Sequence, residues 1–491
     1  MSRIRSIALA GSAIATFALG GCMDAGGSIP SASAPISQAE AQQGAELHPQ
    51  LLEEFGGAMS GSQADYVRSV GQKIAVQSGL GNAQSDFTVT LLNSSVNNAF
   101  AIPGGYVYTT RQLVTLMNNE AELAGVLGHE VGHVAARHSQ RRQAAAQRNS
   151  ILGAVGAILS GVLLGDSSIG STLAKGFMQG SQLLTLKFSR SQESQADELG
   201  IQYLTTAGYD PRAMATVLQS LAAQNTLDAQ LQGRNSASIP EWASTHPDPA
   251  SRVQAAYAKA GNGGGVLNRD TFLTRIDGLM YGDDPAQGVI EGRQFIHPQL
   301  GLSFMAPDGF YMVNGTRAVS INGQSGQAQM STAAYNGNLD TYVTSVFKAL
   351  GGTQQTLAPS SIEHTTVNGL PAAYGTARVT SGSSQVDVVV FAYQFSKTQA
   401  FHFAAIAPAG KAGVFSPMFN SMRRITSAEA ASVVPRRLDV VTVARGDTVA
   451  SLSKRMAYTD SPEARFRALN GLGANDTLQA GQKVKIVVRS R

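Results

Sequence analysis

The spacing of apolar residues changes along the chain and predicts a different element in each stretch. Between residues 46 and 85 apolar side chains recur at helical spacing, on one broad face that comprises Tyr66, Val67, Val70, Ile74 and Ala75. Residues 87–92 alternate and are rich in strand formers, which predicts a strand. Residues 98–102 and 106–110 flank Pro103-Gly104-Gly105, so a strand, a turn and a second strand are expected.

Three further helices are expected from the residues at their ends. The first begins in the Asn118-Asn119 pair, either of which can cap it, and runs to about Arg142. The second begins near Ser189 and ends at Ala207-Gly208, where glycine is the expected stop residue. Asp210-Pro211 caps the third, with proline in its tolerated first position.

Residues 151–165 are apolar on all sides, unlike the helices around them. The run is shorter than the roughly 20 residues that a membrane crossing needs. A buried helix or a mobile hydrophobic flap is therefore favoured over a membrane span.

The chain of 491 residues is too long for one core, and its composition divides it. The spacing of apolar residues over residues 46–262 predicts a mainly helical domain with a small sheet. A glycine-rich stretch opens a predicted linker over 263–289. Short strands interrupted by helical stretches predict a separate α+β domain at 290–428, and residues 436–491 form a third unit. The fold class expected for the whole chain is α+β.

The first 45 residues are expected to be a targeting segment followed by a flexible tether. Arg3 and Arg5 precede a short apolar run that ends in Leu19-Gly20-Gly21-Cys22. This resembles a bacterial lipoprotein signal peptide over residues 1–21, with cleavage before Cys22 and acylation of that residue. An ordinary cleaved signal and a buried free thiol are the alternatives. Residues 22–45 are rich in Gly, Ser, Pro, Ala and Gln and predict the tether.

The same segment indicates a location. A lipid on Cys22 would anchor the chain to one leaflet of a membrane. Met23, rather than an aspartate, follows the cysteine, which favours the periplasmic face of the bacterial outer membrane.

The composition excludes an internal disulfide, and the charge pattern argues against nucleic acid as a partner. The chain has one cysteine, so it forms no internal disulfide. The formal charge of +4 is scattered over a sequence with 14% charged residues. No face is obviously basic and no basic–aromatic interleaving occurs, so nucleic acid is not an expected partner.

The candidate chemistry begins with His129-Glu130-Val131-Gly132-His133 on the first of the three later helices. Residues four apart on a helix point the same way, so His129 and His133 can converge on one cation at roughly 2.0–2.1 Å. Glu130 lies about 60° around the helix from His133, displaced from the ion. This is where a base for a metal-activated water is needed.

Two histidines leave such a metal short of a ligand, because a catalytic zinc takes three protein ligands and keeps an open position. His138 is a poor candidate, since on a continuing helix it has turned about 140° off the face. Glu193, at the start of the second helix, is the better third ligand. Asp197 lies one turn further on and suits a hydrogen bond to a ligand imidazole. Small residues, including Gly132 and Gly200, indicate that the two helices pack closely.

These residues resemble the M48 family of gluzincin zinc metalloproteases over roughly residues 46–260. The resemblance rests on residues 98–105, 129–133 and 188–197, on Ser244-Thr-His-Pro-Asp-Pro249 and on Arg252. It implies one Zn²⁺ per chain at His129, His133 and Glu193, with Glu130 as the base. It also implies an edge strand that pairs with an extended polypeptide substrate, formed by Asn98, Ala99, Phe100, Ala101, Pro103, Gly104 and Gly105.

Two further residues acquire roles from the same resemblance, and each keeps an alternative. His246 can cap the zinc in a resting state or steady the oxyanion, and an ordinary loop histidine is the alternative. Arg252 can contact the oxyanion or brace the fold. Because convincing membrane spans are lacking, the chain is similar to the soluble periplasmic or lipoprotein branch of the family.

The rest of the chain carries weaker resemblances. Residues 444–449, 470–472 and 478–484 are similar to a LysM module, which binds N-acetylglucosamine chains of peptidoglycan; a docking or scaffold module is the alternative. Residues 295–298 and 302–307 resemble PsbP-like folds, and no chemistry is assigned there. His297, His364 and His402 are expected to be structural.

The sequence therefore leads to one hypothesis and two competitors. The first is a lipid-anchored zinc endopeptidase of the cell envelope that hydrolyses misfolded or stalled envelope proteins. The second is a latent protease that acts as a chaperone or adaptor for outer-membrane assembly, with its site shut by His246 or by residues 151–180. The third is a peptidoglycan-binding lipoprotein with a vestigial protease.

Overall fold

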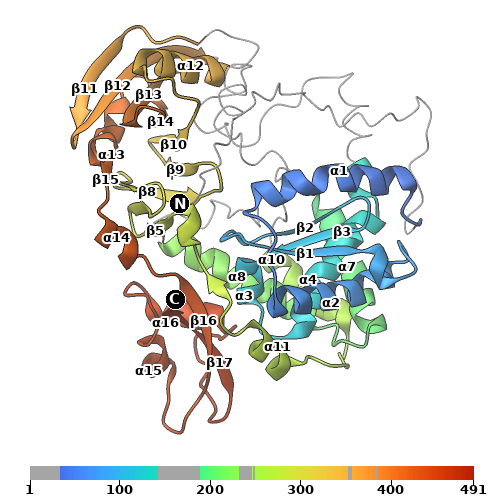
Figure 1. The fold of residues 1–491 in the computed structure, drawn as a ribbon. Coiled ribbons are helices and arrows are strands. Elements are labelled where there is room, and N and C mark those ends of the chain that lie inside the picture. The colour runs from blue at the N-terminus through green and yellow to red at the C-terminus, as the bar shows by residue number, and fades with distance from the viewer. Residues whose placement is uncertain are drawn as a thin grey trace, which may run out of the picture.

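A computed structural model of the chain describes residues 34–141, 188–231, 246, 249–351, 357–381 and 384–490. The predicted signal peptide, Cys22 and the apolar run 151–165 lie outside the described residues. Among the helices that are described, none combines the length and apolar character that a bilayer crossing requires. Figure 1 shows three parts, coloured blue to green, yellow to orange, and red along the chain.

The first part contains a small sheet held between helices. Its strands are β1 (Thr88–Leu92), β2 (Ala99–Ile102) and β3 (Tyr106–Thr110), in the order β1-β3-β2. β1 and β3 are parallel, whereas β2 runs antiparallel to β3. The strand, turn and strand predicted around Pro103-Gly104-Gly105 are therefore present, and β2 lies at the edge of this sheet.

Helices cover both faces of that sheet because its side chains alternate. Tyr108 points toward α1 (Gln38–Glu54) and joins a small core with Leu51 and Phe55. Val107 points the other way, into the main core that includes α2 (Ser62–Ala75) and α4 (Glu120–Ala135). In Figure 1, α1 lies across the sheet on the side away from α4.

Side-chain caps begin the helices that carry the candidate ligands. Asn119 caps α4 by accepting a hydrogen bond from the backbone N–H of Glu122 at 2.9 Å. Ser189 caps α7 (Arg190–Thr206) in a reciprocal pair with Gln192. The remaining helices of this part are α3 (Arg111–Leu116), α8 (Ala213–Leu231) and α10 (Pro249–Ala260).

The prediction that the first of these helices runs to about Arg142 is wrong. α4 ends at Ala135, and the backbone turns at Arg137, whose φ is 55°. Arg137 is held there because its buried guanidinium donates to the carboxylate of Glu40 and to the carbonyl of Ala34 at 2.7 Å. A long-range ion pair therefore ends the helix, and no glycine or asparagine marks the position.

The segments predicted to be a tether and a linker contain regular structure. α1 begins at Gln38, inside the expected tether, because Ser37 and Glu40 form a capping box. The expected linker 263–289 contains α11 (Arg269–Ile276) and the short strand β4 (Met280–Tyr281). α11 buries Phe272, Leu273 and Ile276, whose helical spacing follows the glycine run.

The middle region, residues 289–424, is built from two antiparallel sheets. The larger contains β8 (Phe310–Asn314), β9 (Val319–Gly323), β10 (Gly326–Thr332), β11 (Ile362–Val367), β12 (Leu370–Ser381), β13 (Ser384–Ser396) and β14 (Gln399–Pro408). Their order is β11-β12-β13-β14-β10-β9-β8. The smaller contains β5 (Val289–Glu291), β6 (Gln294–His297), β7 (Leu302–Met305) and β15 (Arg423–Arg424).

Helices complete that region and make it α+β, as the sequence predicts. α12 (Leu339–Gly351) packs on one face of the larger sheet, and α13 (Ser416–Ser421) packs beside β7. His402 is buried and bonded through its Nδ1 to the Tyr342 hydroxyl at 2.9 Å. His364 is an exposed partner of Asp340, and α14 (Ser427–Ser432) follows the region.

The C-terminal unit has the order strand, helix, helix, strand. β16 (Arg436–Thr442) and β17 (Lys483–Arg489) pair antiparallel, and α15 (Val449–Ser453) and α16 (Pro462–Leu469) lie between them in sequence. β4 joins the same sheet beside β16. Phe466 and Val484 of this unit belong to the same hydrophobic core as Leu123 of α4, so the first and last parts share one interior.

Candidate metal centre

The candidate centre starts with the two histidines of α4. His129 and His133 are both buried, and their Nε2 atoms lie 3.0 Å apart. Two ring nitrogens at this distance need a proton or a cation between them, because their lone pairs otherwise repel. The four-residue spacing has thus produced the paired donors that the sequence predicts.

Glu193 reaches the same point from the first turn of α7. Its Oε1 lies 3.3 Å from His133 Nε2 and its Oε2 lies 3.6 Å from His129 Nε2. The helices approach closely because both have small residues at their crossing. A Cβ added to Gly200 would lie 3.1 Å from the backbone nitrogen of His129, and one added to Gly132 would lie 3.2 Å from the Ala196 carbonyl oxygen.

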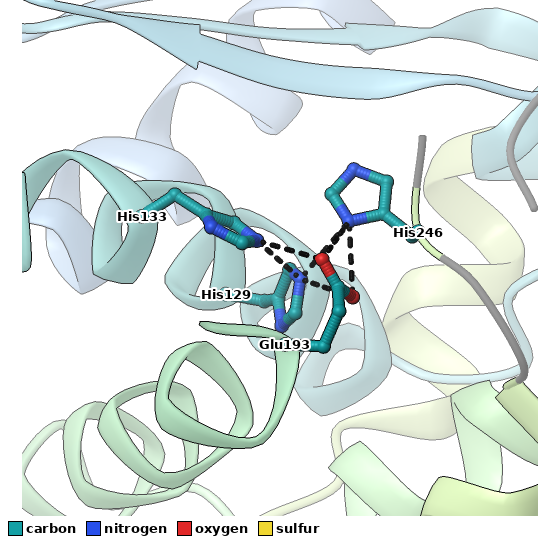
Figure 2. A group of neighbouring side chains, drawn as sticks. All are labelled: His129, His133, Glu193 and His246. Atoms are coloured by element: carbon teal, nitrogen blue, oxygen red, sulfur yellow. Dashed lines mark hydrogen bonds and ion pairs between the residues drawn. The ribbon is translucent and has the colours of Figure 1, made fainter. Parts of the chain in front are cut away.

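His246 closes the group from a distant part of the chain. Its Nδ1 lies 3.3 Å from His129 Nε2 and 3.1 Å from Glu193 Oε1. Figure 2 shows the three imidazoles and the carboxylate turned toward one another. One donor atom from each of the four residues lies within 4.8 Å of the others, and all four residues are buried.

The separations that involve His129 or Glu193 fit donors around one tetrahedral metal ion. Donors bound at roughly 2.0–2.1 Å and tetrahedral angles lie about 3.3 Å from one another. The separations given above, between 3.0 and 3.6 Å, bracket that value. Three nitrogens and one carboxylate oxygen form a donor set that zinc takes. The residues present therefore fit the ion that the sequence predicts.

Asp197 fixes the ring of one ligand. Its Oδ1 lies 2.9 Å from His129 Nδ1, and its Oδ2 accepts a hydrogen bond from Arg252 Nε at 2.8 Å. With its Nδ1 proton donated to Asp197, His129 presents the lone pair of Nε2 to the centre. This is the contact that the one-turn spacing of Glu193 and Asp197 predicts.

Arg252 lies behind the ligands, where it contacts both acidic residues. Its Nη1 donates to Glu193 Oε2 and its Nη2 donates to Asp197 Oδ1. Burial raises the pKa of Glu193, but the nearby His246 and the hydrogen bonds from His133 and His246 lower it well below its usual range. Arg252 thus forms ion pairs with both carboxylates.

Glu130 lies beside the donors with one oxygen unsatisfied. Its side chain is buried, and its Oε1 lies 3.5 Å from His246 Nε2. Within the described part of the chain that oxygen accepts no hydrogen bond. Burial raises the pKa of this carboxyl, against the opposing fields of His246 and His129. An orphaned buried carboxylate oxygen next to a metal-binding group is placed to take a proton from water.

His138 has a contact in the centre that helical spacing does not predict. It does not join the donors, but its Nδ1 lies 2.8 Å from His133 Nδ1, and its Nε2 lies 3.0 Å from Gln195 Oε1. The chain returns His138 to His133 because α4 ends at Ala135 instead of continuing. The ring of Phe188 stacks on His133 with centroids 3.8 Å apart. No local signal in the sequence marks either contact.

The predicted substrate strand lies against the metal-bearing helix. β2 packs along α4, and at the end of β2 the turn Pro103-Gly104-Gly105 has positive φ at both glycines, 97° and 82°. A Cβ on Gly104 would lie 2.5 Å from the Glu40 carbonyl oxygen, because α1 packs on this turn. β3 occupies one side of β2, and no described strand pairs with the other.

Comparisons with known proteins agree with this centre. Residues 61–260 match the profile of Peptidase family M48, and residues 441–487 match the LysM domain. The Beta-barrel assembly-enhancing protease of Escherichia coli O157:H7 is 36% identical over 197 residues, which cover 40% of this chain and 38% of that protein. Mitochondrial metalloendopeptidase OMA1 of Schizosaccharomyces pombe is 29% identical over 216 residues, covering 43% of this chain and 57% of that protein.

One solved structure that resembles the chain is more distant. Cyanobacterial PsbP from Synechocystis sp. PCC 6803 shares 11% identity at a TM-score of 0.22, over 27% of this chain and 91% of that chain. The matched residues span less than two thirds of the length of either curated relative. The chain therefore carries a peptidase domain of family M48 at residues 61–260 and a LysM domain at residues 441–487.

Proposed function

We propose that this protein is a zinc-dependent endopeptidase of the bacterial cell envelope that hydrolyses misfolded or stalled envelope proteins. The observation that carries the proposal is the group of four buried donor atoms, with the orphaned carboxylate oxygen of Glu130 beside it. The substrate class is supported by the name of one relative, the Beta-barrel assembly-enhancing protease.

Each residue of the centre has a defined task in this function. His129 Nε2, His133 Nε2 and Glu193 would hold the zinc, which when bound would supply a positive charge that polarises a water and the scissile carbonyl. Glu130 accepts the proton of the attacking water and passes it to the leaving amine, a use for which a raised pKa suits a carboxylate. Asp197 and Arg252 keep the His129 ring and the Glu193 carboxylate oriented.

The substrate enters as an extended polypeptide along β2. An edge strand offers its unpaired backbone N–H and C=O groups to a new strand, so affinity comes from main-chain hydrogen bonds and demands little sequence specificity. Asn98, Ala99, Phe100 and Ala101 supply that edge, and the Pro103-Gly104-Gly105 turn ends it. Unfolded segments are the polypeptides that can adopt this conformation beside a buried centre.

Residues outside the peptidase domain complete the proposal. A lipid on Cys22 would hold the protein at the periplasmic face of the outer membrane. The LysM domain would add a contact with peptidoglycan, which lies in the same compartment. Sedimentation of the full chain with purified peptidoglycan, in competition with N-acetylglucosamine oligomers, tests the second contact.

Cleavage of unfolded casein by the zinc-loaded full chain tests the activity. We expect cleavage that stops when a chelator removes the metal and returns when one equivalent of zinc is restored, because the donors remain in place around the centre. Magnesium added instead of zinc should not restore activity, since it prefers oxygen ligands in octahedral geometry. Cleavage that persists in the metal-free chain would exclude the zinc mechanism.

The position of His246 favours a latent protease as the second candidate. Its Nδ1 occupies the place of a fourth donor, which in an active zinc protease belongs to water or substrate. A resting enzyme shut in this way would act as a chaperone or adaptor until the histidine moves aside.

Substitution His246→Ala measures that latency. We expect a small hydroxamate inhibitor to bind the variant roughly tenfold more tightly than it binds the wild type, because no imidazole competes for the fourth position. The zinc content should stay at one per chain, since three ligands remain. His364→Ala, at an exposed site of the middle region, is the control. Equal inhibitor affinity in the wild type and His246→Ala would reject the latent state.

A further inference from the structure

Lys485 of the LysM domain is a fully buried amine at the boundary with the peptidase domain. It lies on β17 and is 0% exposed. Its Nζ donates to the carbonyl oxygens of Thr115 at 2.7 Å and Met117 at 2.6 Å, at the C-terminal end of α3. Carbonyls at the end of a helix lack partners within the helix and carry its negative dipole end, so an amine is favoured there.

One peptide group connects this amine to the metal-bearing helix. The peptide between Met117 and Asn118 accepts from Lys485 through its carbonyl, and its N–H donates to Glu122 Oε2 at 2.7 Å. Glu122 lies in the first turn of α4 and is buried, and its Oε1 accepts from the Thr216 hydroxyl at 2.7 Å. Hydrogen bonds joined through one peptide polarise and strengthen each other.

The charges of Lys485 and Glu122, at the two ends of this hydrogen-bond network, stabilise each other. Burial lowers the pKa of Lys485 to about 7, and the field of Glu122 opposes that shift. Burial also raises the pKa of Glu122, and its hydrogen bonds and Lys485 oppose the rise. Loss of Lys485 or of Glu122 would leave the charge of the other residue buried without an opposite charge to stabilise it.

The first turn of α4 lies close enough to the candidate metal centre for its position to affect the ligand imidazoles. Glu122 precedes His129 by seven residues on an unbroken helix, about 10 Å along its axis. A helix packed on all sides moves as a unit, so a shift of its first turn also moves the two imidazoles. Donor atoms around a zinc tolerate displacements of only a few tenths of an ångström.

Other contacts hold the LysM domain in the same place. Arg269 of α11 donates to the Lys483 carbonyl at 2.8 Å, and β4 pairs with β16. α16 packs against α8 and α3. The two domains also share one hydrophobic core. This is an interior contact with buried polar partners, unlike the exposed linkers that join independent modules.

We propose that the LysM domain, through Lys485, positions the metal-bearing helix α4 and is an integral part of the peptidase. Lys485 is a positioning residue that acts through the Met117–Asn118 peptide and Glu122. The proposal rests on the proposed function only in taking the donor group as a zinc site, and it requires neither peptidase activity nor glycan binding.

Lys485→Met in the full chain tests the proposal, because methionine keeps much of the side-chain volume but cannot donate to the two carbonyls. The matched control is Lys483→Met on the same strand, whose Nζ donates to the Thr274 hydroxyl at 2.9 Å at the exposed rim. We expect Lys485→Met to lower the melting temperature by roughly 5 °C. We also expect it to release zinc to a chelator about tenfold faster at a temperature where both proteins are fully folded.

The zinc readout separates positioning from support of the fold. A lower melting temperature with zinc release equal to that of Lys483→Met would reject the positioning role. An unchanged melting temperature together with an unchanged rate of zinc release would reject the proposal entirely. If Lys485→Met does not accumulate as folded protein, Glu122→Met removes the acceptor of the Asn118 N–H from the helix side and should show the faster release. The melting temperature and the rate of zinc release are both measured without casein cleavage. A protein that binds zinc but cleaves nothing would therefore leave this inference standing.

Discussion

Glu130→Gln is expected to reduce casein cleavage by about 10²- to 10⁴-fold, the usual contribution of a positioned general base. Glutamine has nearly the size of glutamate but cannot accept a proton from water at neutral pH. The remaining contributions to catalysis, from the metal and from substrate pairing, would persist as a small residual rate. Initial rates at saturating casein, measured with equal zinc content in both proteins, give the ratio directly.

The same variant is expected to keep its zinc and its fold. Glu130 is not among the residues whose donor atoms form the metal-binding group. Its buried carboxylate has a raised pKa, so a neutral amide at this position relieves a desolvation cost. A stability equal to or above that of the wild type is therefore expected. Cleavage at the wild-type rate would remove Glu130 from the mechanism.

Arg252→Met is expected to have the largest effect on stability, about 3–5 kcal/mol in the metal-free protein. The guanidinium donates to Glu193 and to Asp197, and both carboxylates are buried. Removal of the arginine leaves two acidic groups close together in the interior without this cation. Equilibrium unfolding in urea, with the metal removed from both proteins, measures the loss.

Zinc should reduce that loss, because the bound ion supplies positive charge to Glu193 in place of the guanidinium. The difference between the variant and the wild type is therefore expected to be smaller in saturating zinc than in chelator. Arg212→Met serves as the control, since Arg212 pairs with Asp210 but is 47% exposed, and a surface pair contributes roughly 0.2–1 kcal/mol. Equal stability of Arg252→Met and the control would show that Arg252 braces nothing.

These two variants separate the two kinds of residue at the centre. Glu130 lies beside the donors with an unsatisfied oxygen, whereas Arg252 is fully engaged behind them. Loss of the first should impair chemistry without affecting the fold. Loss of the second should impair the fold and, through Glu193, the affinity for the metal. A protein in which both variants behave alike would contradict the division of roles.

The ligands that local periodicity determines were predictable from the sequence alone. The four-residue spacing of His129 and His133, and the same spacing of Glu193 and Asp197, decide which side chains share a helix face, whatever the helix packs against. Asn119 and Ser189 begin the two helices as caps because each hydrogen bond closes within three residues. These features need no knowledge of the rest of the chain.

Contacts between distant residues were decided only by the tertiary structure. The buried pair of Arg137 and Glu40 ends α4 early and returns His138 to His133, although the local sequence favours a longer helix. His246 reaches the donors from a segment far along the chain, and sequence spacing could not predict its distance from them. Lys485 donates to carbonyls 368 and 370 residues away. The contact between the LysM and peptidase domains therefore could not be predicted from the sequence pattern of either domain. The physical reason is that helical periodicity fixes directions within one element, whereas burial of charged groups depends on which elements meet.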